Sequence, residues 1–582
     1  MLDNAIKSSG TPLAAESLSE SAHKISLWPL LCCAGVFLLS ILFSISVFYS
    51  FAGFSTHNWI SLKLKWFGSW IPVYLGSAPH DVFHLKEAGF IEWMVLLACM
   101  TIAYALAAFF IYRQAREATT KTILAFIFGG VIIAALLYLF TPAMVTTDIF
   151  SYENYGRLLS VHAANPYFVP PNAYQGDVSL QWVFKAYRNV VSIYGPIWTL
   201  VSSLLSGFSI TQMGMIIVFR GFAILCHLAN IVLVIATLRM LKRSPRVVLL
   251  GAFLYAWNPL VLLEACMSGH NDVFMAFFML LGLYFCARGE RKGTFTQWRS
   301  YIPAILAFTA SALVKFSSAP LLIIFVLALF FAKVHADSKD GKLIWRPALV
   351  PALLASCICI VFALALYAPF YSGHSVQAII SSVTNLPSAT QSQNSILATF
   401  FYYNEAHRLH GIVTILNSRK LWNILNIVGL LLPIMVGCRY LWRTPDTRTI
   451  ALVTLASLGG FLLTSPWFFS WYLVWVMILI PFCLPVQKER LARALLAFGL
   501  SFSITCFLAY YTSTVGWRLA AMKPASDSWS IWQNLGMFVI PLLAFLIFWF
   551  YPPRNARVEQ ELEPQAISAF SSITASASAD PQ

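Results

Sequence analysis

A short polar segment, Thr146–Arg157, follows directly after an apolar run that ends near Pro142. Its first acidic residue, Asp148, is therefore expected at the edge of an apolar environment. Partial desolvation there raises the pKa of a carboxyl group and makes it a better general base. The same position also suits an Asp that only caps the next helix, so the residues alone leave both roles open.

Helical spacing distributes the other polar side chains of this segment over different faces. Tyr152 shares a face with Asp148, whereas Arg157 and the rival carboxylate Glu153 lie on others. Further along, Tyr194 opens a Tyr-Gly-Pro turn before the next apolar segment. An acid with aromatic walls and a nearby cation can form a pocket, so the candidate substrate contacts in this region are Tyr152, Glu153, Arg157 and Tyr194.

A second polar cluster lies in a tight connection between two later apolar runs. It contains Glu264, Ser268 and the run Gly269–Asp272. The side chains of His270, Asn271 and Asp272 could bind a phosphate group or sugar hydroxyls, and a helix cap at Asp272 is the plain structural alternative. His and Asp can also ligate a divalent ion, but no further ligand stands at a fixed spacing, so no metal site is predicted.

Lys315 stands inside an apolar hairpin, in the sequence Leu-Val-Lys-Phe. An unpaired cation at such a depth costs a few kcal/mol. A lipid phosphate is a natural partner for it, although the long side chain can also reach the membrane surface by snorkelling.

Membrane helices must position all of these side chains. The chain is 59% hydrophobic and 10% charged, with a mean hydropathy of +0.73, whereas a soluble domain has about 25% charged residues. Apolar runs of about 20 residues recur along it and predict an all-α integral membrane protein with about 14 transmembrane helices. Residues 301–313 and 467–484 are among these expected crossings, and the short run 197–208 is expected to be a re-entrant or juxtamembrane helix.

Basic residues set the expected topology. The net charge of +15 arises mainly from short loops between apolar runs, which indicates positive cytoplasmic loops and not a nucleic-acid partner. We therefore expect a multi-pass protein of the plasma membrane with both termini cytoplasmic. The expected parts are a tail at 1–26, a transmembrane domain at 27–551 with external loops at 52–90, 142–212, 371–420 and 512–534, and a disordered tail at 552–582. The 11 Cys residues, which lie mostly in apolar runs, indicate neither disulfides nor a zinc site.

Taken together, the motifs resemble a known family, the polyprenol-phosphate-mannose-dependent α-1,6-mannosyltransferases of the GT-C superfamily of multispan glycosyltransferases. The matching residues are Thr147–Tyr152 with Gly156-Arg157, Asn165–Tyr167, Tyr194–Pro196, Asn258–Leu260, Gly269–Asp272 and Val314-Lys315, with a weaker match at Pro466-Trp467 and Trp471-Tyr472. Their order and separations cover roughly residues 140 to 475.

This resemblance implies a GT-C fold in which Asp148 is the catalytic base and the donor is a polyprenyl-phosphate sugar, most simply mannose. The acceptor would be a glycan or glycolipid, the active site would be extracytoplasmic, and no cofactor is predicted. A transporter or lipid flippase is the main alternative, because broken helices with polar residues occur there too. A ligase or polymerase that uses lipid-diphosphate sugars is a second alternative.

Overall fold

The computed structural model describes residues 27–51, 87–141, 146–208, 211–338, 342–384, 394–400, 418–485, 489–511 and 526–551. The expected tails at 1–26 and 552–582, and most of the expected external loop at 52–90, lie outside the described residues. Within the described part the chain forms helices and turns and contains no strand, as the composition predicted.

The described helices follow one another along the chain with short connections. The first group is α1 (Trp28–Phe51), α4 (Glu87–Gln114), α5 (Thr120–Leu139), α6 (Asp148–Ser160), α7 (Pro196–Leu205) and α8 (Gln212–Met240). The second is α9 (Pro245–Ala256), α10 (Pro259–Leu262), α11 (Asp272–Arg291), α12 (Trp298–Val314), α13 (Ala319–Asp337), α14 (Arg346–Tyr371) and α15 (Val376–Thr384). The last is α19 (Arg419–Arg443), α20 (Thr447–Thr464), α21 (Val474–Met477), α22 (Arg490–Thr505), α23 (Ala509–Tyr511) and α25 (Ser526–Phe550).

In the described ranges, 11 helices are long and apolar enough to cross a membrane, or 12 if the pair Pro245–Ala256 and Pro259–Met267, bent by 50°, is one span. Both numbers are below the 14 transmembrane helices expected from the sequence. The difference lies in α12, which has only 17 residues, and in 467–484, which is divided into short helical turns around α21. Hydropathy detects an apolar run but not the places where a helix breaks within it. At 10 residues, or about 15 Å, α7 is too short to cross a bilayer core of roughly 30 Å.

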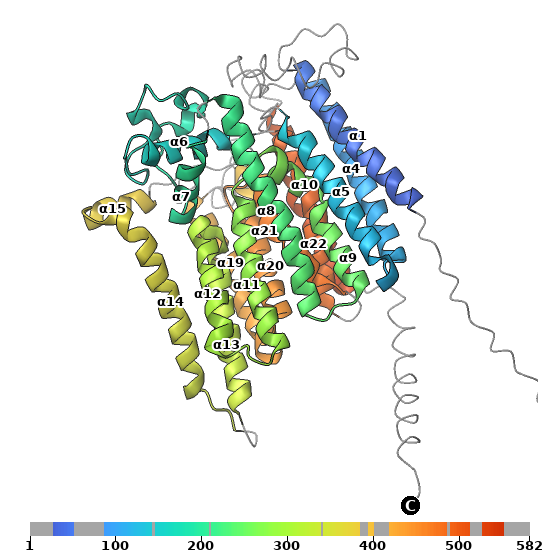
Figure 1. The fold of residues 1–582 in the computed structure, drawn as a ribbon, viewed down its shortest axis with the longest axis vertical. Helices are drawn as coiled ribbons and strands as arrows, with labels where there is room; N and C mark the ends of the chain where they lie inside the picture. The colour runs from blue at the N-terminus through green and yellow to red at the C-terminus, as the bar shows by residue number, and fades with distance from the viewer. Residues whose placement is uncertain are drawn as a thin grey trace, which may run out of the picture.

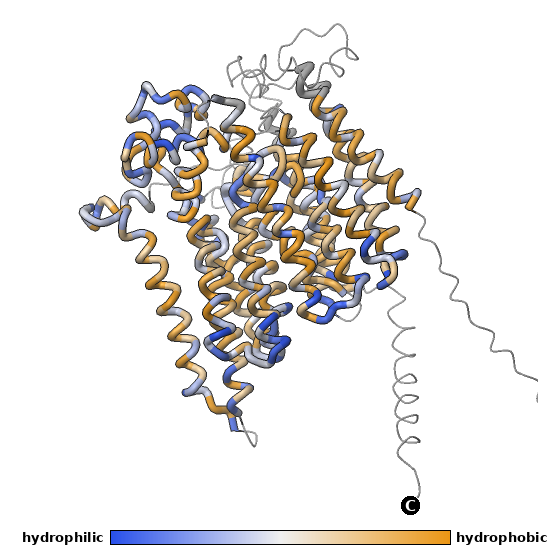
Figure 2. The backbone as a smooth tube through the Cα atoms, in the orientation of Figure 1, coloured by the Kyte–Doolittle hydropathy of each residue, from blue (hydrophilic) through white to orange (hydrophobic). Residues whose placement is uncertain are grey.

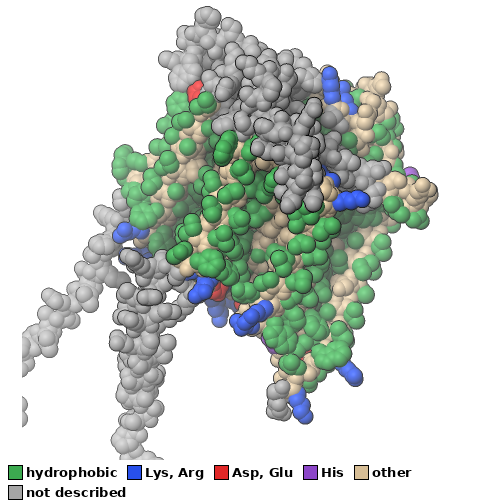
Figure 3. Space-filling model, turned by 180° about the vertical axis from the view of Figure 1, so that it is seen from behind, with side chains coloured by type: hydrophobic (Ala, Val, Ile, Leu, Met, Phe, Trp, Pro, Cys, Tyr) green, Lys and Arg blue, Asp and Glu red, His purple; other side chains and the backbone are tan. Residues whose placement is uncertain are grey.

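The long helices run side by side, and the polar parts gather at the two ends of this bundle. Helices α6 and α7 lie at one end, while the basic connections α8–α9 and α13–α14 lie at the other (Figure 1). Hydropathy along the tube is highest between these ends (Figure 2). From behind, hydrophobic side chains cover the middle of the molecule (Figure 3). Val350 of α14 and Met435 of α19 are 66% and 70% exposed, as expected for helices that face lipid.

Candidate active site

A buried Arg fixes the helix end that leads to the first motif. Arg220 of α8 has no exposed surface, and its Nη1 donates to the carbonyl oxygens of Tyr138 (3.1 Å) and Leu139 (3.2 Å) in the last turn of α5. A third bond goes to the carbonyl of Thr141. Helix C-termini leave such carbonyl groups without helical partners, so Arg220 ties α5 to α8 just before the chain reaches α6.

Asp148 is the first residue of α6, and the N-cap position belongs to Thr147, which makes no side-chain capping bond. The side chain of Asp148 is 20% exposed. Burial raises the pKa of its carboxyl group to about 6; the Lys315 ammonium opposes this rise and the Asp272 carboxylate adds to it. Asp148 is therefore ionised at neutral pH but is a stronger base than an ordinary Asp.

The second polar cluster folds back onto α6. The hydroxyl of Tyr152 lies 3.2 Å from Nδ1 of His270 and donates to Oδ1 of Asn271 at 3.4 Å. Nδ1 of His270 is also 3.7 Å from Oδ2 of Asp148, and its ring stacks on Trp471 at 4.2 Å between centroids. Two segments separated by more than 100 residues, both predicted from sequence, thus form one site.

A π-helical turn, Leu263–Met267, directs Glu264 toward this cluster. Its Oε1 accepts a hydrogen bond from the hydroxyl of Tyr510, and its Oε2 lies 3.3 Å from Nε2 of His270. The turn closes through Gly269, whose φ of +65° favours glycine, and an added Cβ would lie 3.0 Å from the side chain of Ile149. π-Helical turns are rare and occur frequently at functional sites.

Lys315 is not the unpaired cation that its sequence context suggested. Its Nζ lies 2.7 Å from Oδ1 of Asp272, and it stands over the rings of Tyr472 (4.9 Å) and Trp475 (5.4 Å). The indole of Trp475 donates to the same Asp272 oxygen. The Lys315 side chain remains 15% exposed while Asp272 is fully buried, so the cation is the accessible member of the pair.

The Tyr194 turn is built against the end of α12. The amide of Gly195 donates to the carbonyl of Val314 at 3.1 Å, and a Cβ on this glycine would lie 2.0 Å from the carbonyl oxygen of Leu313. The ring of Tyr194 meets that of Tyr152 edge-on at 5.2 Å. A side chain at 195 would separate α7 from α12, so this glycine keeps Tyr194 beside the cluster.

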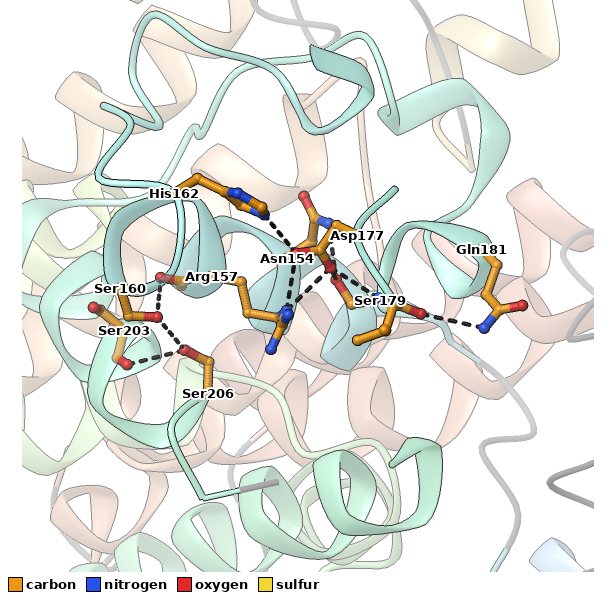
Figure 4. A network of polar contacts seen from close by, with 11 residues as sticks. Asn154, Arg157, Ser160, His162, Asp177, Ser179, Gln181, Ser203 and Ser206 are labelled. Atoms are coloured by element: carbon orange, nitrogen blue, oxygen red, sulfur yellow. Dashed lines mark hydrogen bonds and ion pairs between the residues drawn. The ribbon is translucent and has the colours of Figure 1, made fainter. Parts of the chain in front are cut away.

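Arg157 lies on the far side of α6 from Asp148. Its Nε is 3.0 Å from Oδ1 of Asp177, and Nε2 of His162 is 2.7 Å from the other oxygen of the same carboxylate (Figure 4). Burial alone would raise the pKa of Asp177, but the bonds from Arg157, Ser179 and His162 hold it at about 2. Arg157 is therefore bonded to Asp177 in the loop that follows α6. Helical spacing alone does not predict this partner.

Glu153 is also kept apart from the cluster. It is fully buried, and neither carboxyl oxygen has a hydrogen-bond partner among the described residues. Burial raises the pKa of Glu153 to about 8, with opposition from the Arg157 cation. The carboxyl group is therefore mainly protonated at neutral pH, which suits a buried acid better than a general base.

Sequence reasoning missed Arg220, Trp475 and Tyr510. Arg220 carried a usable signal, since a lone Arg within an apolar run must face a polar partner. The two aromatic residues carried none, because they stand in apolar runs where aromatic side chains are common. Across the described ranges, no three His, Cys, Asp or Glu side chains are grouped so that they could hold a metal ion.

Residues 61–332, a little under half of the chain, match the family model of the alpha-(1→6)-mannopyranosyltransferase N-terminal domain. This region contains Asp148, His270 and Lys315. No curated protein matches the chain. With its membrane helices, the match defines the class: a multispan membrane glycosyltransferase. Residues 61–332 thus carry the N-terminal domain of the alpha-(1→6)-mannopyranosyltransferase family, which is the family that the motifs predicted.

Proposed function

We propose that the chain transfers mannose from a polyprenyl-phosphate donor to a hydroxyl group of a glycan or glycolipid on the extracytoplasmic face of the plasma membrane. The family match supports mannosyl transfer. The observation that carries the mechanism is the partly exposed carboxylate of Asp148, with a pKa raised to about 6, in the field of the Lys315 cation.

One general base is enough for this chemistry. The acceptor oxygen attacks C1 of the sugar from the face opposite the phosphate, and Asp148 takes the hydroxyl proton as the new C–O bond forms. The bond from C1 to the phosphate oxygen breaks, and polyprenyl phosphate leaves without needing a proton. The transfer therefore inverts the anomeric centre.

The charge that develops on the leaving phosphate needs a cation. Lys315 is 15% exposed and keeps N–H groups beyond its bond to Asp272, so it is our candidate for this contact. His270, Asn271 and Asp272 are at most 1% exposed. We propose that they form the buried layer that supports the donor site. Tyr152 and Tyr194 form its aromatic wall.

Contacts at the two ends of the bundle support the expected 14 crossings. The bond between Asp272, at the start of α11, and Lys315, just after α12, requires α12 to return to the end from which α11 began. Likewise Nε of Arg448, at the start of α20, donates to the carbonyl of Phe482 at 3.0 Å, so 467–484 returns to the basic end. With these two returns, the basic connections fall on one side and α6 on the other, which supports an external site and cytoplasmic termini.

Product analysis tests the proposal directly. Purified protein in lipid nanodiscs is incubated with radiolabelled polyprenyl-phosphate-mannose and a mannan oligosaccharide, with a nucleotide-linked mannose as the control donor. Extension of the oligosaccharide from the lipid donor alone, with an α linkage formed from a β-linked donor, is the expected result. Extension from the nucleotide donor alone, or retention of configuration, would contradict it.

A further inference from the structure

His270 lies between two carboxyl groups. Its Nε2 is 3.3 Å from Oε2 of Glu264, and its Nδ1 is 3.7 Å from Oδ2 of Asp148. A neutral imidazole has one N–H group and one nitrogen lone pair, so it can donate to only one of these neighbours. Burial, with the Lys315 cation as a second cause, lowers the pKa of His270 well below its usual value and favours this neutral form.

The surroundings of Glu264 decide which nitrogen keeps the proton. Glu264 has no exposed surface, and apart from His270 no cationic side chain lies within ion-pairing distance of it in the described part of the chain. Its Oε1 already accepts from Tyr510, and the Ser268 hydroxyl lies beside the same carboxyl group. Its Oε2 and Nε2 of His270 lie 3.3 Å apart, and each is without a hydrogen-bond partner among the described residues. A buried carboxylate without a cation is costly, whereas a neutral carboxyl group can accept at Oε1 and donate from Oε2.

We propose that Glu264 acts in its neutral form as a positioning residue: it donates its proton to Nε2 of His270 and thereby keeps the imidazole proton on Nδ1, facing Asp148. The inference rests on the proposed function of Asp148 as the base. An N–H group directed toward the Asp148 carboxylate favours its ionised form and its orientation, whereas a lone pair there would repel the anion.

The other groups around His270 are compatible with this tautomer. From α6, the oxygen of Tyr152, 3.2 Å from Nδ1, is the acceptor of this proton, and its own proton goes to Asn271. Asp148, 3.7 Å from Nδ1, then faces the positive end of the N–H group without a direct hydrogen bond to it. Asp272 at the start of α11 is bonded to Lys315, and Trp471 covers the ring face without competing for either nitrogen. Glu264 is therefore the one described group positioned to donate to Nε2.

Two substitutions separate a neutral donor from an anion. Glu264→Gln keeps an acceptor for Tyr510 and an N–H donor for His270 but can neither ionise nor accept a proton. Glu264→Leu removes the donor, and combining it with Tyr510→Phe also removes the hydroxyl group that bonds to Glu264. The measurement is the pH dependence of kcat from pH 5 to 8.5 with the lipid donor, together with KM, on membranes with equal amounts of folded protein.

The expected result is that Glu264→Gln keeps kcat within about threefold and the acid limb near pH 6, as in the unmodified chain. In Glu264→Leu/Tyr510→Phe the limb should move up by about one pH unit, and kcat should fall roughly tenfold with KM little changed.

A Gln variant that loses turnover would show that Glu264 acts as an anion or proton acceptor. An unmoved limb in the double variant would refute the link to Asp148. If the double variant does not fold, loss of turnover in Glu264→Gln would still refute the neutral form, and unchanged turnover with an unmoved acid limb would still support it. Absence of lipid-dependent transfer in the unmodified chain, or full activity of Asp148→Asn, would instead contradict the proposed function.

Discussion

Replacement of Asp148 by Asn is the most direct test of the mechanism. Asn has nearly the same shape as Asp and can still bond to neighbouring groups, but it cannot take a proton from the acceptor hydroxyl. Loss of a general base typically costs 10²- to 10⁴-fold in rate, or about 2.7 to 5.5 kcal/mol of barrier height. We therefore expect kcat of Asp148→Asn to fall by that factor while donor affinity stays within about threefold.

The raised pKa gives the test a second, independent readout. With a pKa of about 6, roughly 97% of Asp148 is ionised at pH 7.5 and about half at pH 6. Below pH 6 the rate of the unmodified enzyme should therefore fall about tenfold per pH unit. The residual rate of Asp148→Asn should lack this limb, because the group that titrates has been removed.

Both readouts come from one assay, the transfer of label from polyprenyl-phosphate-mannose to an oligosaccharide by protein in nanodiscs. Glu153→Gln is a matched control, since it removes a buried carboxyl group from the same helix without touching the cluster. Near-normal turnover of Asp148→Asn, or an unchanged acid limb in its residual activity, would refute the assignment of the base. Loss of transfer in Glu153→Gln alone would point to Glu153 instead.

Three further predictions follow from the same contacts. Folding raises the pKa of Glu153 above its ordinary value to about 8, so the native state loses stability as pH rises between these two values. Glu153→Gln should therefore raise the melting temperature by a few degrees at pH 8 and by less at pH 5.5. An equal effect at both pH values would contradict the interpretation of Glu153 as a buried neutral acid. Lys315→Gln should lower kcat/KM for the lipid donor roughly 10- to 100-fold and Lys315→Arg much less, as measured in the transfer assay; equal losses would indicate packing instead of charge. A Cys introduced at exposed Gln181 should react with an impermeant thiol reagent outside intact cells and one at exposed Lys292 should not, with the unmodified chain as background; the reverse pattern would overturn the topology.

The sequence predicted the membrane bundle well because apolar runs and basic loops report directly on burial in lipid. It was less reliable where a run breaks: α12 and residues 467–484 have the apolar character of full spans but not the length or continuity of one long helix. The bends are stabilised by contacts with distant helices, such as the bond from Trp475 to Asp272, which no local pattern contains.

The proposed active-site residues show the same division. Asp148 and the His270 cluster could be found because polar side chains at the end of an apolar run are costly without a role. Arg157 was assigned only to a helix face, and its partner Asp177 reaches that face because the following loop folds back. The role of Glu264 depends on a π-helical turn and on Tyr510, 246 positions away, so spacing alone could not indicate it.

Helix α6 separates two tasks by its two sides. Asp148, the proposed base, faces the bundle. On the opposite side Arg157 holds the loop at 161–192 through Asp177, and the bond from the Ser192 amide to the carbonyl of Pro166 closes this loop. The loop is also bonded to α7 through Tyr167 and Thr199 and to α14 through Asn165 and Phe370, so it links α6 to both helices. A replacement loop that keeps these bonds would leave α6 in place while it changes the surface beside the proposed site. Chimaeras that exchange this loop between relatives would show whether acceptor choice is inherited separately from chemistry.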